Sequence, residues 1–165
     1  MDTPDACWRL LTDNADKDIT VKTLDEGSVK TILPLAMHDF VVRKKDGFPA
    51  YQLSSVIDDL YYGVDLVVRG EDLWQSTIAQ HYLAETLHQD EFKDITFHHH
   101  SLLMQDAEKK LSKSAGDTSI RYLRGQGKKP TDIYSQIGRS MGIDEPVYDW
   151  GQLGELAIAL DGNSY

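Results

Sequence analysis

Cysteine is nearly absent from this sequence, since Cys7 is the only one among 165 residues. An internal disulfide is therefore impossible, and a zinc site built on paired cysteines is excluded. No apolar run approaches the roughly 20 residues that span a bilayer, so we expect no membrane partner. The N-terminal stretch from Met1 to Asp5 lacks the basic and apolar regions of a signal peptide, which predicts a cytoplasmic location.

Positive charge is also scarce, because 17 lysines and arginines face 27 acidic residues, for a net charge of −10. This balance argues against broad, nonspecific binding of nucleic acid, which needs a cationic surface. The positive charge that is present gathers in one stretch, formed by Lys109, Lys110, Lys113, Arg121, Arg124, Lys128 and Lys129. A polyanion could therefore dock on one side of the protein.

The first part of the chain carries weak structural signals. Residues 1–38 are polar and irregular, and we expect them to form a lead-in or linking region. From Asp39 the pattern sharpens: Phe40 to Arg43 is strand-like, Asp46-Gly47 predicts a hairpin turn, and residues 48–53 would return as the second strand. A short helix over 54–62 should follow, ended by Gly63.

The middle of the chain predicts a strand–helix–strand unit. Val64 to Val68 is a short apolar run, as expected of a buried parallel strand. Asp72 is a plausible N-cap for the next helix, whose apolar row is Ala79, Leu83 and Leu87. Residues 95–104 read as the second strand, which completes a βαβ unit. Three helices are predicted beyond it, over 119–124, 131–141 and 152–160.

Two groups of polar residues follow the predicted parallel strands, where ligands of open α/β sheets bind. The first is Arg69-Gly70-Glu71-Asp72, and the second is the loop Lys110-Leu111-Ser112-Lys113-Ser114. Two lysines and two serines in one loop suit a triphosphate. On composition alone, a solvated surface loop remains the more common reading of such residues.

Arg69 allows two interpretations of equal weight. An arginine just past a buried strand can hold a ligand carboxylate in a bidentate pair, with Tyr51 as a candidate neighbour. It can equally pair inside the protein with Glu71, Asp72, Asp58 or Asp59. His98-His99-His100 would alternate between the two faces of a strand, so we expect no metal site there.

The loop at Lys110 to Ser114 matches the KMSKS signature of class I aminoacyl-tRNA synthetases, with leucine in place of methionine. The segments that resemble the glutamyl-tRNA synthetase catalytic domain are residues 39–53, 56–59, 63–64, 68–72 and 110–120. The resemblance implies an α/β fold: the second half of a Rossmann-like catalytic domain over 39–118, then a helical region over 119–165.

The resemblance also implies roles for individual residues. Tyr51 and Arg69 match the residues that hold glutamate, with Arg69 on its carboxylate. Lys110 and Lys113 match the catalytic lysines of the signature loop, and Ser112 stands with them as an ATP-binding residue. The implied reaction activates glutamate with ATP, with Mg as the usual counterion, and then passes glutamate to tRNA. No zinc site is expected.

Two departures from the family pattern matter. No stretch resembles the HIGH motif, which the family places before the segment that matches residue 39, and the residues after the signature loop are too few to form the anticodon-binding domain that the family would lead us to expect. The shortness makes the chain most similar to glutamyl-queuosine tRNA(Asp) synthetases, which load glutamate onto a modified base. We expect the exposed edge of the Val64 to Val68 strand to be covered by a partner chain such as a missing N-terminal half, by a second copy, or by a rearrangement of residues 1–38. The alternative is an inactive truncated paralogue that binds glutamate or tRNA.

Overall fold

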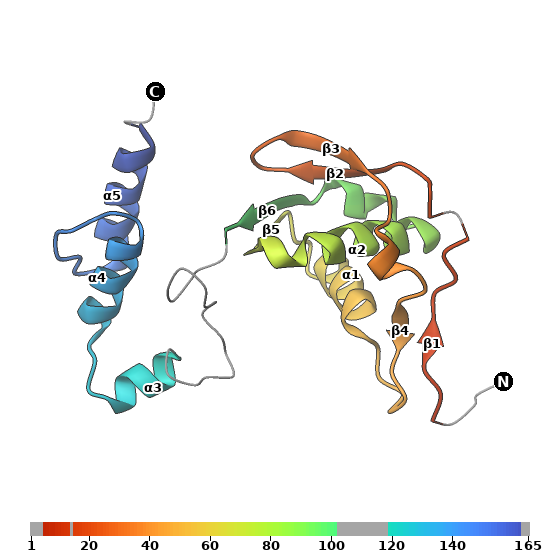
Figure 1. Ribbon diagram of the computed structural model, residues 1–165, viewed down its shortest axis with the longest axis horizontal. Helices are drawn as coiled ribbons and strands as arrows, with labels where there is room; N and C mark the ends of the chain where they lie inside the picture. Colours follow the sequence, from red (N-terminus) through yellow and green to blue (C-terminus); the bar gives the residue numbers. More distant parts are fainter. Residues whose placement is uncertain (1–4, 14, 102–118, 163–165) are drawn as a thin grey trace. The chain divides into compact units, whose positions relative to one another are not determined.

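The computed structural model describes residues 5–13, 15–101 and 119–162 (Figure 1). The chain divides into two compact units, residues 1–102 and residues 103–165. The first unit is a sheet with helices on one face, and the second is helical. The expected mixture of parallel strands and helices, followed by helices, is therefore confirmed.

A four-stranded sheet organises the first unit, in the order β3-β2-β6-β5. Its strands are β2 (Ile19–Thr23), β3 (Gly27–Thr31), β5 (Leu66–Gly70) and β6 (Thr96–His100). β2 and β3 form an antiparallel hairpin, whereas β6 runs parallel to both β2 and β5. Residues from the lead-in thus add a hairpin to one edge of the parallel pair, and β5 forms the opposite edge.

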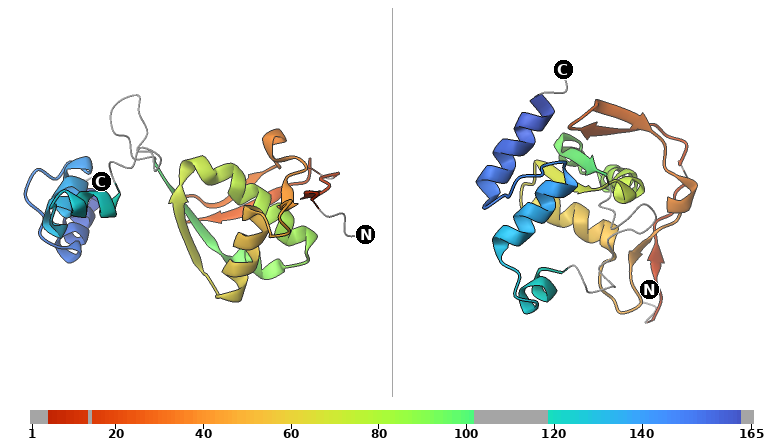
Figure 2. Two further views of the ribbon diagram at one scale, coloured as in Figure 1. Left: turned by 90° about the horizontal axis from the view of Figure 1, so that it is seen from below. Right: turned by 60° about the vertical axis from the view of Figure 1, so that its left-hand side comes forward.

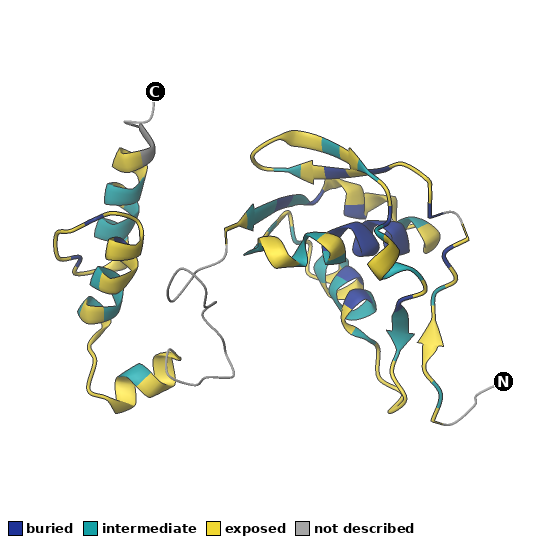
Figure 3. Ribbon diagram, in the orientation of Figure 1, coloured by how far each residue is buried: buried dark blue, intermediate teal, exposed yellow. Residues whose placement is uncertain are grey.

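The βαβ unit is present as predicted, with α2 (Trp74–Thr86) between β5 and β6. All residues from Thr77 to Ala84 are buried, because the sheet covers α2 on one side and α1 (Tyr51–Tyr61) packs against another (Figure 3). The N-cap prediction at Asp72 was wrong, since η2 (Glu71–Leu73) is a 3-10 turn and α2 begins at Trp74. Leu87 lies beyond the helix and is exposed.

The predicted hairpin over 40–53 was wrong in its second half. β4 (Val41–Arg43) pairs instead with β1 (Trp8–Arg9), in an antiparallel two-stranded ribbon. The returning segment makes a single bridge, between Arg43 and Pro49, and α1 begins two residues later. Proline has no backbone N–H to continue a ladder, and the extended Ala50 that follows it is the N-cap of α1.

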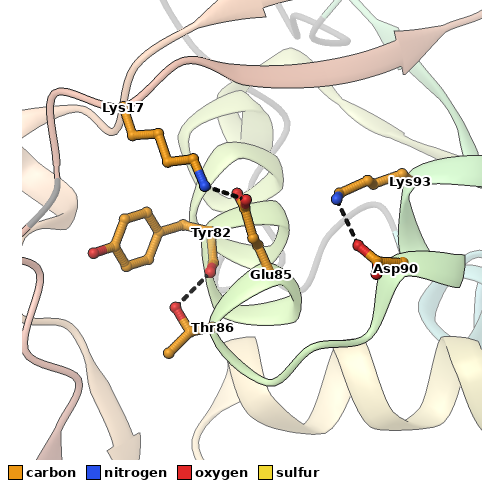
Figure 4. Close-up of polar contacts among 6 residues, drawn as sticks. All are labelled: Lys17, Tyr82, Glu85, Thr86, Asp90 and Lys93. Carbon is orange, nitrogen blue, oxygen red and sulfur yellow. Dashed lines mark hydrogen bonds and ion pairs between the residues drawn. The ribbon is translucent and has the colours of Figure 1, made fainter.

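Polar contacts fix the end of α2 (Figure 4). Lys17, ahead of β2, forms an ion pair with Glu85 of the last helical turn. The Thr86 hydroxyl donates to the Tyr82 carbonyl at 2.8 Å, one turn back. In η3 (Asp90–Asp94), Lys93 and Asp90 pair at 2.6 Å. The connection from α2 to β6 is therefore short and locally bonded. A further 3-10 turn, η1 (Leu35–Met37), precedes β4.

The sheet has one covered face and one open face among the described residues. Ile19, Val21 and Phe97 point toward the helices and are buried. On the opposite face, Leu66 and Val68 of β5 are 45% and 59% exposed. Figure 2 shows that the helices of this unit lie on one side of its sheet. Parallel sheets usually bury both faces, so this open face is unusual.

The second unit contains α3 (Ile120–Gly125), α4 (Pro130–Ser140) and α5 (Trp150–Gly162), as the sequence predicted. Ser135 of α4 fastens the loop before α5. Its hydroxyl accepts from the Val147 amide at 2.9 Å and donates to the Val147 carbonyl at 3.1 Å.

None of the helices in the described parts of the chain combines the length and apolar character that crossing a membrane requires.

Candidate functional site

Arg69 and Tyr51 come together at the carboxyl end of β5. Arg69 is the fourth residue of that strand, and alternation along the strand turns it toward α2, on the same face as Phe97 of β6. Tyr51 is the first residue of α1 and is 53% exposed. The Arg69 Nη1 donates to the Tyr51 hydroxyl across 3.5 Å. The two residues that sequence reasoning proposed as neighbours are therefore in contact.

The guanidinium of Arg69 is held by three neutral oxygens. Besides Tyr51, its Nη2 donates to the Thr77 hydroxyl and to the Gln80 side-chain carbonyl, the latter at 2.8 Å. The plane of Phe97 lies below it, with 5.2 Å between the guanidinium carbon and the ring centroid. Such a cation–π contact favours the charge, but it supplies no counterion.

Internal ion pairing of Arg69 was the competing interpretation. The ion pairs within 4 Å among the described residues are Lys17–Glu85, Lys44–Asp46, Lys93–Asp90 and His98–Asp25, and none of these involves Arg69. Asp59 of α1 is close enough to interact electrostatically. Burial raises the pKa of this carboxyl, and the Arg69 charge only opposes that rise. In the described part of the chain, Arg69 is thus a cation without a contacting carboxylate.

Burial has a matching effect on the cation. It lowers the pKa of the Arg69 guanidinium, and the neighbouring Tyr51 and Asp59 oppose this shift. Arginine still keeps its proton at neutral pH, because its ordinary pKa lies far above neutrality. A positive charge held in a low-dielectric environment by neutral dipoles is poised to attract an anion. A carboxylate is the anion that suits a guanidinium best.

Three residues of this site were missed by the sequence analysis. Thr77 and Gln80 lie on α2 and have no exposed surface, and His99 lies beside Arg69 on β6, with its Nε2 2.8 Å from the Thr77 hydroxyl. Burial and the Arg69 charge lower the pKa of His99. Polar residues one turn apart inside an apolar helix were the available signal, because buried polar groups need partners.

A cavity of about 470 Å³ opens at the same edge of the sheet. Its walls combine aromatic rings with carboxylates, from Thr23, Asp25, Glu26, Val29, Glu71, Trp74, Phe97 and His99. The expected ATP-binding residues Lys110, Ser112 and Lys113 lie outside the described residues. Within the described ranges, no group of three or more histidine, cysteine, aspartate or glutamate side chains is placed to hold a metal ion.

Comparison with known proteins points to one family. The family model described as tRNA synthetases class I (E and Q), catalytic domain, matches residues 2–146. Glutamate–tRNA ligase 2 of Gluconacetobacter diazotrophicus is 34% identical over 140 residues, which cover 85% of this chain and 31% of that protein. Glutamyl-Q tRNA(Asp) synthetase of Pseudomonas aeruginosa is 34% identical over 135 residues, covering 76% of this chain and 45% of that protein.

A solved structure is similar as well. The crystal structure of a glutamate tRNA ligase from Elizabethkingia meningosepticum, in complex with its amino acid, matches with a TM-score of 0.50 and 30% identity. The match covers 62% of this chain and 20% of that one. The chain thus spans between 31% and 45% of the length of these two curated relatives, and less of the solved structure.

Proposed function

Since this chain belongs to the family of class I tRNA synthetases for glutamate and glutamine, we propose that it supplies the glutamate-binding half of a glutamate-type aminoacyl-tRNA ligase. In this role Arg69 pairs with a carboxylate of glutamate, and the Tyr51 hydroxyl binds beside it. Lys110, Ser112 and Lys113 contact the phosphates of ATP, which brings Mg as its counterion. The described site and the signature loop would then serve one reaction.

That reaction has two steps. Glutamate displaces pyrophosphate from ATP to form glutamyl-adenylate, and the glutamyl group then passes to tRNA. Arg69 and Tyr51 position the amino acid, and the two lysines stabilise the charge that develops on pyrophosphate. No covalent enzyme intermediate is required, so the chain acts by positioning and electrostatics. We place this reaction in the cytoplasm.

The observation that supports the proposal is that Arg69 has no contacting counterion among the described residues. Every hydrogen bond that Arg69 makes with a described residue goes to an uncharged oxygen. Leaving a partly buried cation uncompensated costs stability, and such sites are found where a ligand supplies the opposite charge. A substrate carboxylate fits both the chemistry and the position beyond a parallel strand.

Calorimetric titration with glutamate tests the proposal. We expect binding to the purified chain, and a loss of at least about tenfold in Arg69→Met, because a charge-assisted hydrogen bond contributes about 1.5–3 kcal/mol. Tyr51→Phe should weaken binding less, since it removes a neutral hydroxyl and leaves the positive charge in place. Lys30→Gln is the matched control, because it removes a positive charge from β3 in the same unit. Equal affinity of Arg69→Met and the unsubstituted chain would refute the glutamate site.

The tRNA that receives the glutamyl group can be of two kinds under this proposal. The relatives carry the names of both glutamate–tRNA ligases and glutamyl-Q tRNA(Asp) synthetases. Transfer of labelled glutamate to tRNA(Glu) would assign the first chemistry, and transfer to tRNA(Asp) the second.

The alternative function is a binding module, or one half of a split enzyme. Within the described residues, β5 has an open face and no strand pairs with its outer edge, which favours this alternative, since a further segment could complete the sheet there. A second copy could cover the same edge. A module should bind glutamate or tRNA without turnover, whereas one half of a split enzyme should gain activity when the other half is added.

A further inference from the structure

Thr77 is the hub of the Arg69 site. Its hydroxyl carries one proton and two lone pairs, and it has three neighbours. It accepts from Arg69 Nη2, lies 2.8 Å from His99 Nε2, and lies 3.3 Å from the Leu73 carbonyl. The side chain is fully buried, so water does not compete for these bonds. Thr77 therefore fixes the Arg69 nitrogen relative to both α2 and β6.

Gln80 holds the same nitrogen from one turn further along α2. Its side-chain carbonyl accepts from Arg69 Nη2 at 2.8 Å, and the whole residue is buried. The amide Nε2 of Gln80 has no hydrogen-bond partner among the described residues. A buried amide that keeps one group unpaired costs free energy, which indicates that its carbonyl has a use beyond packing.

Both hydrogens of Arg69 Nη2 are thereby engaged. The Nε atom of Arg69 is also closed to a ligand, because it is buried. Only Nη1 remains open to a ligand, next to the partly exposed Tyr51 hydroxyl. An incoming carboxylate then meets one guanidinium nitrogen and one phenol, rather than the two-nitrogen fork of a free arginine.

We propose that Thr77 and Gln80 are positioning residues that hold Nη2 of Arg69 so that Nη1 and Tyr51 together receive the substrate carboxylate. This inference rests on the proposed function and refines its site. Neither residue touches the substrate, because both are buried behind the guanidinium. Their effect on binding runs entirely through the orientation and the free charge of Arg69.

Gln80→Glu gives the sharpest test. A carboxylate has nearly the shape of the amide, but it would neutralise Arg69 from inside the protein. We expect glutamate affinity to fall at least about tenfold while the urea midpoint at pH 7 stays equal or rises, since a buried ion pair replaces a lone cation. Loss of binding through misfolding would lower both quantities together. Unchanged glutamate affinity in Gln80→Glu would overturn the proposal.

Two substitutions at Thr77 test whether its hydroxyl is needed for glutamate binding. Thr77→Val keeps the shape and removes the hydroxyl, and we expect about a tenfold loss of glutamate affinity. Thr77→Ser restores the hydroxyl and should bind within about twofold of the unsubstituted chain. Ser76→Ala, at the preceding position of the same helix, is the control, because Ser76 contacts Gln52 and not Arg69. Equal binding by the valine and serine variants would contradict the role of Thr77.

A readout without glutamate separates this proposal from the function on which it rests. In the ¹⁵N-labelled chain, restrained rotation of the Arg69 guanidinium should give separate Nη signals. These signals should merge in Thr77→Val. If glutamate does not bind but the signals merge, the proposed function fails and the positioning of Arg69 stands. Separate signals in both proteins would refute the positioning role of Thr77.

Discussion

His81 is a histidine held neutral in the core. Its ring packs between Phe92 and Phe97, with centroid distances of 5.0 and 5.3 Å, and the residue is 4% exposed. Burial, followed by the charges of Arg69 and Lys93, lowers its pKa to about 4. The ring nitrogen Nε2 has no hydrogen-bond partner among the described residues. Protonation would place a charge in the core where the described charges that act on the ring, those of Arg69 and Lys93, are also positive.

The stability of the first unit should therefore depend on pH through His81. The unfolded chain binds the proton with the ordinary pKa of 6.5, so stability is full above that value and falls as the pH drops toward about 4. The loss amounts to about 3 kcal/mol. Urea denaturation followed by circular dichroism at a series of pH values measures it.

The variant His81→Leu should remove most of this pH dependence, since it leaves no group to protonate. His88→Asn is the matched control, because His88 is exposed and asparagine tolerates its positive φ of 55°. The control should keep the full loss below pH 6.5. A pH profile of His81→Leu identical to that of the unsubstituted chain would show that another group is responsible.

Residue roles could be predicted from the sequence where a polar side chain follows a strand. Arg69 was found in this way, with Tyr51 named as its candidate neighbour, and the two are in contact. Thr77 and Gln80 were not, because helical periodicity identifies which residues face the core and not which polar atoms meet there. The roles of Tyr51, Arg69, Lys110, Ser112 and Lys113 in binding stay predictions until titration tests them.

At the scale of elements, the prediction succeeded for the βαβ unit and the three later helices. Apolar runs and helical rows specify such elements locally. It failed at the segment after Gly47, because the hairpin signal of Asp46-Gly47 was followed by Pro49, which cannot extend a ladder. Pairing of β4 with β1 joins residues that are distant in the sequence, so no local sequence pattern predicts it.

The free edge of β5 should be a docking edge in an active enzyme. Val68→Lys places a charge on its open face, where the residue is 59% exposed, so the free energy of unfolding of the isolated chain should change by no more than about 0.5 kcal/mol. A lysine on an edge strand blocks pairing with another chain. We therefore expect this variant to lose association with a segment that carries the HIGH motif, as measured by sedimentation.

Thr20→Lys is the control for the edge. Thr20 is exposed on the same open face but belongs to β2, two strands away from the edge. It should leave association unchanged. If Val68→Lys associates as well as Thr20→Lys does, the docking surface lies elsewhere.

At the scale of the whole molecule, the question is whether this chain performs the chemistry alone. The sequence has no HIGH-like stretch, so we expect little or no glutamate-dependent exchange between ATP and pyrophosphate from the purified chain. Adding the HIGH-containing segment of a relative should produce exchange, and Arg69→Met should abolish it again. Robust exchange by the chain alone would contradict the split-site proposal. The functional division at residues 38 and 118 stays a proposal as well.

The pairing of the β2–β3 hairpin with β6 has a consequence for biosynthesis. The contact between Asp25 and His98 joins residues 73 positions apart, so the hairpin cannot join its sheet until β6 has been made. At about 5–20 residues per second, the ribosome needs roughly 4–15 seconds to reach that point. Closing so long a loop is also slower than forming the β5–α2–β6 unit from neighbouring segments. The newly made hairpin therefore waits for that time without the strand with which it pairs.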